Sequence, residues 1–98
     1  PDEAEPHLQQ LLEQVGEPTN AEDRATVVTS YKFLEVIYMV RGNNVIVDAQ
    51  NLRHDAQEKR GSEKTAMIKQ ADELEAQSQE IFAKTQEMKE LAKMYDLQ

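Results

Sequence analysis

Two histidines and scattered carboxylates are the side chains of this sequence best suited to acid–base chemistry or metal binding. His54 and Glu58 lie four residues apart, so on a helix they would share one face and supply two ligands of a metal site. No third ligand follows in an HExxH, paired ExxH or EF-hand pattern. The sequence therefore predicts no metal and no cofactor, and we expect His54 to face solvent.

The remaining nucleophiles and acids do not form a catalytic pattern either. Ser30 and Ser78 have no base at helical spacing, and the absence of cysteine removes thiol catalysis, disulfides and thiolate metal sites. The carboxylates in residues 72–75 are expected to form a solvated face beside Lys69. The three glycines lie far apart, so no glycine-rich loop is present to hold a phosphate. We therefore expect a protein that is not an enzyme.

The charge of the chain is concentrated near its start. The 98 residues include 11 basic and 19 acidic side chains, a net charge of −8, and residues 1–23 contain no lysine or arginine. These N-terminal acids would either stabilise helix N-termini or dock on a basic partner. An acidic chain is a poor ligand for nucleic acid. Neither an apolar run of about 20 residues nor a signal-peptide pattern occurs, so we expect a soluble, cytoplasmic protein without a membrane span.

The spacing of apolar residues predicts a short helix over residues 3–15. Gly16, followed by Glu17 and Pro18, is expected to end this helix. Thr19 and Glu22 have the spacing of a capping box, which would start a second helix near residue 20. The apolar residues of the first helix fall on one face, at i, i+3, i+4 and i+7: Leu8, Leu11, Leu12 and Val15.

The second segment, residues 20–59, admits two interpretations. Apolar stretches flank Gly42–Asn44, so the segment could form two strands joined by a turn. One long helix explains the pattern better, because an apolar row continues through Gly42 at spacings of three and four residues. The helix would tolerate the glycine at a cost of about 1 kcal/mol. The row consists of Val27, Tyr31, Leu34, Tyr38, Gly42, Val45, Ala49, Leu52 and Ala56.

Residues 62–96 carry a matching row and predict a third helix. In the turn between them, Gly61 is expected to be left-handed and Ser62 to cap the third helix. Pairing the two long helices outward from this turn sets large residues against small ones, with Ile81 opposite Gly42. The row alternates between large and small side chains: Met67, Ala71, Leu74, Ser78, Ile81, Thr85, Met88, Ala92 and Tyr95.

These elements predict an all-α fold with a single domain, residues 1–98. A long antiparallel helical hairpin, packed like a coiled coil, would combine with the short N-terminal helix in a three-helix or dimeric bundle. The short helix can cover only the open end of the hairpin, around Phe33, Ile37 and Leu91. The second helix is apolar nearly all round and must therefore be buried on more than one side.

We therefore predict a protein partner, either a second copy or another helical protein, that covers the remaining apolar surface. The predicted function is a non-enzymatic interaction module, a small assembly subunit or a chaperone. The predicted partner-binding residues are Phe33, Val36, Ile37, Met39, Val40, Ile46, Val47, Ile68, Phe82 and Met94.

An alternative function comes from the order of segments in the middle of the chain. A dense apolar helix at residues 33–40 precedes Gly42-Asn43-Asn44, and a coil rich in alanine, glutamine and glutamate follows at residues 48–63. This third of the chain resembles the helical filament subunits of type III secretion systems. The resemblance implies a self-assembling coiled-coil filament or another secretion-system component.

Overall fold

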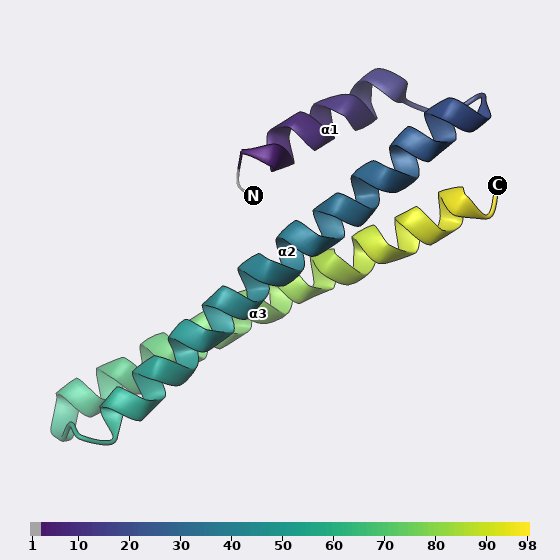
Figure 1. The fold of residues 1–98 in the computed structure, drawn as a ribbon. Coiled ribbons are helices and arrows are strands. Elements are labelled where there is room, and N and C mark those ends of the chain that lie inside the picture. Colours follow the sequence, from purple (N-terminus) through teal and green to yellow (C-terminus); the bar gives the residue numbers. More distant parts are fainter. Residues whose placement is uncertain (1–2) are drawn as a thin grey trace.

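The computed structural model describes residues 3–98 and folds them into three helices without a strand (Figure 1). The helices are α1 (Ala4–Val15), α2 (Ala21–Ala56) and α3 (Gly61–Asp96). α2 and α3 run side by side as a long antiparallel hairpin, and α1 folds back along α2. The molecule is a rod of 61 × 24 × 14 Å. The predicted all-α fold, a long hairpin with a short N-terminal helix, is confirmed.

α2 continues through Gly42 as one helix, so the alternative of two strands is wrong. The row predicted to face α3 is also the row that the structure buries. α3 contributes three small residues to this contact, Ala71, Ser78 and Ala92, and all three are buried. The hydroxyl of Ser78 donates to the carbonyl oxygen of Glu75 at 2.6 Å, so its burial leaves no unsatisfied donor. The buried members of the α2 row are Val27, Leu34, Tyr38, Gly42, Ala49 and Ala56.

The side chain packed over Gly42 belongs to Phe82 and not to Ile81, the residue that pairing of the rows predicts. A Cβ atom on Gly42 would lie only 2.7 Å from Cε1 of Phe82. The absence of a side chain therefore lets the phenyl ring rest directly against the backbone of α2. The prediction of a close contact at this glycine is right, and the residue that makes the contact is one position further along α3.

The start of α2 differs from the predicted capping box. Asn20, and not Thr19, is the N-cap: its Oδ1 accepts a hydrogen bond from the backbone N–H of Asp23 at 2.8 Å. Asparagine is among the strongest N-cap residues, and its side chain satisfies a donor that the helix leaves free. Gly16 ends α1, as predicted, and has a φ of 60°.

The turn between the long helices also differs in detail. α2 ends at Ala56, three residues before the predicted end, because the residues after it are exposed and have no apolar contact with α3. α3 begins at Gly61 with Arg60 as its N-cap, so Ser62 lies inside the helix and does not cap it. Gly61 has the predicted positive φ, 65°, but as the first residue of α3.

An ion cluster joins α2 to α3 near the turn. Arg53 donates from Nη2 to Asp72 at 2.7 Å and to Glu75 at 2.5 Å. Hydrogen bonds to Asp72 and then Glu75 raise the pKa of Arg53, so the guanidinium stays charged. The carboxylates of residues 72–75 lie on a largely exposed face, as expected, and two of them also pair with a long arginine side chain that reaches them from the other helix.

A pair of stacked tyrosines closes the other end of the hairpin. The rings of Tyr31 and Tyr95 lie 5.9 Å apart between centroids and are tilted by only 15°. Burial raises the pKa of the Tyr31 phenol, and the negative charges that Tyr95, Glu17 and Glu87 can carry raise it further. The folded chain therefore holds the Tyr31 proton more tightly than the unfolded chain does.

We expect this stack to weaken in alkali. Above the unfolded pKa of about 10, the unfolded chain loses the Tyr31 proton first, so stability falls as pH rises through the folded pKa. Thermal unfolding followed by circular dichroism between about pH 9 and 11 measures the fall. Tyr31→Phe, which has no phenol to ionise, should show a smaller decrease in Tm over this range. An equal decrease in both proteins would contradict the prediction.

Candidate functional site

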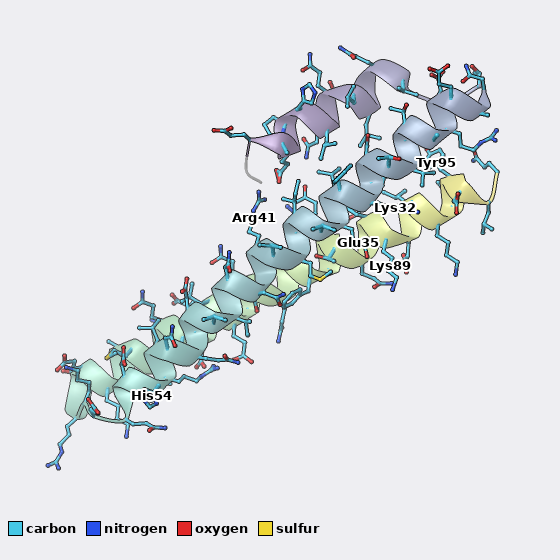
Figure 2. All side chains as sticks on the ribbon, in the orientation of Figure 1. Lys32, Glu35, Arg41, His54, Lys89 and Tyr95 are labelled. Atoms are coloured by element: carbon cyan, nitrogen blue, oxygen red, sulfur yellow. The ribbon has the colours of Figure 1, made fainter. Side chains whose placement is uncertain are left out.

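α1 packs on α2 alone among the described residues, and no residue within Ala4–Val15 is fully buried. Two polar contacts hold its first half. Arg41 donates to Oε2 of Glu5 at 2.7 Å, and Gln9 donates to the hydroxyl of Tyr38 at 3.4 Å. Figure 2 shows Arg41 extending from α2 toward the start of α1. α1 therefore lies beside the N-terminal half of α2, and the C-terminal half of α2 projects beyond it toward the turn (Figure 1).

The structure exposes most of the predicted partner-binding residues, but not all. Ile37 is only 7 % exposed, because it lies on the side of α2 that faces Ala4 and Leu8 of α1. Phe82 is half-buried against Gly42, and Ile46 is also half-buried. These three residues are therefore not part of the freely exposed surface. The exposed residues of the predicted set are Phe33, Val36, Met39, Val40, Val47, Ile68 and Met94.

Four of the exposed residues form a row on α2, which we call the α2 stripe: Phe33, Val36, Val40 and Val47. Their spacings of three, four and seven residues place them on one helical face. This face points away from the row that packs against α3, since the two rows are about half a turn apart around the helix. Phe33, at the end of the stripe nearest α1, is 57 % exposed. α2 thus carries a second row at helical spacing that the described residues leave about half exposed.

A groove runs between α1 and α2 and ends at the α2 stripe. We define this α1–α2 groove by Leu8 and Leu11 of α1 and by Ala25, Thr29 and Phe33 of α2. Its wall is apolar except for hydroxyl groups and Glu22 at one end. Around Phe33 it continues to Val36, where Lys32 is the charged neighbour. The groove and the stripe therefore form one continuous apolar surface.

The sequence indicated neither the small residues that line the groove nor one exposed apolar residue elsewhere on the chain. The residues Ala25 and Thr29 line the groove, although their small or polar side chains gave no apolar signal. Leu97, which is 78 % exposed, also lies outside the predicted set, although it is an apolar residue outside the paired rows.

The residues considered for acid–base or metal chemistry are not brought together. His54 is exposed on α2 close to the turn, far from α1 (Figure 2). Within residues 3–98, no group of three His, Asp or Glu side chains has an arrangement that could hold a metal ion. None of the described helices is long and apolar enough to cross a membrane. The chemistry that this surface offers is therefore apolar contact with a few charges at its rim.

Comparisons of the chain with family models, curated proteins and solved structures found no match. The interpretation of the α2 stripe and the α1–α2 groove consequently depends on their own residues.

Proposed function

We propose that this chain is a non-enzymatic helical module that binds another protein through the α2 stripe and the α1–α2 groove. One observation carries the proposal: α2 is apolar on three sides, and only two of them are covered. α3 covers the first side and α1 part of the second, whereas Phe33, Val36, Val40 and Val47 leave the third open to water. Contiguous exposed apolar surface of this kind typically marks an interaction site.

The spacing of the exposed residues supports a helical partner. Residues at intervals of three and four along α2 form the ridge that a second helix packs against. Binding would remove Phe33 and Val36 from water, and each fully buried apolar side chain contributes about 1.5–3 kcal/mol. An assembly subunit or a small chaperone would use its surface in this way.

The double substitution Phe33→Ser and Val36→Ser tests the proposal. Both side chains are exposed, so we expect the hairpin to keep its helical circular dichroism and unfolding temperature. The native chain, purified from the cells that make it, should form a complex heavier than the 11.2 kDa of one chain. The double variant should elute as the single chain, because it lacks the anchor residues of the interface.

Leu97→Ser is the matched control, because it removes a more exposed apolar residue outside the surface. It should leave the complex intact. Light scattering during size exclusion gives the masses. A double variant that keeps the same complex, or a native chain that stays a monomer in every preparation, would contradict the proposal.

Self-assembly into a filament or secretion-system component is a second candidate. One observation favours it: exposed apolar residues occur in separate places, with Ile68 near the turn and Met94 and Leu97 near the end of α3. Contacts between two different patches of one protein produce open chains of subunits. Light scattering would then show a mass that grows with concentration beyond a small oligomer.

A further inference from the structure

We infer that the occupant of the α1–α2 groove is an amphipathic helix of a different protein, with lysine or arginine beside its apolar face. This inference rests on the proposed function and narrows it to one chemistry of partner. It is drawn from the shape of the groove, the charges at its rim and the distribution of charge along the chain.

The shape of the groove fits one helix. The large side chains Leu8 and Leu11 of α1 form one wall, and the α2 wall consists mainly of small or hydroxyl residues that end at Phe33: Ala25, Thr26, Thr29 and Ser30. Small residues beside large ones leave room for the side chains of an incoming helix to pack between the two walls. From residue 22 to residue 36, α2 rises by about 21 Å, which corresponds to about four turns of a bound helix. α1 would then gain a second neighbour and form a layer with α2 and the bound helix.

The end of the groove at the start of α2 carries an acidic side chain without an ion pair. Glu22 lines the groove and has no ion pair within the described part of the chain, whereas Glu5 is paired with Arg41. No lysine or arginine precedes Arg24. The sequence left open whether these acids serve helix N-termini or a basic partner. Glu22 lies in the first turn of α2 and stabilises that helix start, and because it also lines the groove its carboxylate is available to a basic partner.

This charge separates the two classes of occupant. A helix with lysine or arginine beside its apolar face would be attracted to the groove and could pair with Glu22. A second copy would bring the same acidic segment against the first, and like charges placed together at an interface oppose binding. Lys32, on the other side of the groove, would set the direction of the bound helix by favouring an acidic residue near Val36.

Two synthetic peptides test the inference on the intact chain. Both would be amphipathic helices of about 18 residues with the same leucine and alanine face, flanked by lysine in one and by glutamate in the other. Fluorescence anisotropy of the labelled peptides measures their Kd. We expect the lysine peptide to bind at least about tenfold more tightly than the glutamate peptide, and Glu22→Lys to reduce this preference.

Variants of the chain locate the binding. Phe33→Ser should weaken the lysine peptide by at least about tenfold, because it removes the central apolar contact. Leu97→Ser, which changes a more exposed apolar residue outside both the groove and the α2 stripe, should leave the Kd unchanged. Circular dichroism confirms that both variants stay folded, so that a loss of binding reports on the groove alone.

Three results would overturn the inference. The first is equal affinity for the two peptides or binding of neither. The second is binding of the lysine peptide that survives Phe33→Ser and disappears in high salt, which is the behaviour of non-specific charge attraction. The third is a dimer of the chain itself that Phe33→Ser dissociates, since a second copy would then occupy the groove. If the native complex still depends on Phe33 and Val36 while neither peptide binds, the proposed function stands and only this inference fails.

Discussion

Replacing Gly42 with leucine is expected to lower the free energy of unfolding by about 1–3 kcal/mol, the typical cost of overpacking. The first added atom alone, Cβ, would lie 2.7 Å from Cε1 and 3.0 Å from Cδ1 of Phe82. A leucine adds three further carbon atoms at this place, so either the phenyl ring or the α3 backbone must move. The gain in helix propensity on losing a glycine, about 1 kcal/mol, offsets only part of this cost.

Urea unfolding followed by circular dichroism measures the change. Asn44→Leu is the matched control, because residue 44 is exposed on the same helix and a leucine there should be neutral or slightly stabilising. Adding Phe82→Ala to Gly42→Leu should recover part of the lost stability, since the two residues are in contact. If Gly42→Leu instead stabilises the protein, Phe82 does not rest against this part of α2.

The spacing of residues along the chain was sufficient to predict the hairpin. The two long helices pack against each other over their whole length, so apolar residues recur many times along each row. One glycine does not obscure such a pattern. The exact contact at Gly42 was not predictable, because neighbouring residues such as Ile81 and Phe82 differ by only 100° around a helix. A row shows which face packs, whereas the rotation of the helix decides which of two adjacent side chains meets the glycine.

The position of α1 was harder to predict from the sequence than the hairpin. Its leucines show that one face is buried, but not which face of α2 lies under them. Two polar contacts, Glu5 with Arg41 and Gln9 with Tyr38, fix that choice in the structure. Such contacts leave no periodic signal, because a single pair of long side chains can meet from many positions. The sequence did predict α1 near Ile37, and the structure covers Ile37 there, so Ile37 does not belong to the partner surface for which it was also predicted.

Long side chains also explain why the ion pairs of the carboxylates near the turn were not predicted. Asp72 and Glu75 lie outside the apolar row of α3, so the sequence alone indicates only that they face away from the core. Arg53 lies just outside the corresponding row of α2, and the antiparallel arrangement brings its guanidinium to both. The spacing of charges within one helix cannot reveal a contact of this kind, which depends on the register of two helices.

Leu34→Ala is expected to be the most destabilising single truncation, with a loss of about 2–5 kcal/mol. Leu34 is 2 % exposed and is among the largest side chains that the hairpin buries completely. Many of the buried residues of the hairpin are alanines or serines, so the core contains few other large side chains that could fill the cavity. A domain of about this size has only about 5–15 kcal/mol of stability, so the transition should move to clearly lower denaturant concentration.

The matched control, Val40→Ala, turns this stability measurement into a test of the binding surface as well. Val40 is 44 % exposed on the α2 stripe, so its truncation should cost well under 1 kcal/mol in the free chain. The order of the two variants should reverse when affinity for the partner is measured. Val40→Ala should weaken binding directly, whereas Leu34→Ala should weaken it only by unfolding the chain. Equal losses of stability for the two variants would mean that both faces of α2 are buried in the free protein. No apolar face of α2 would then be available to a partner, and the proposed function would lose the observation that carries it.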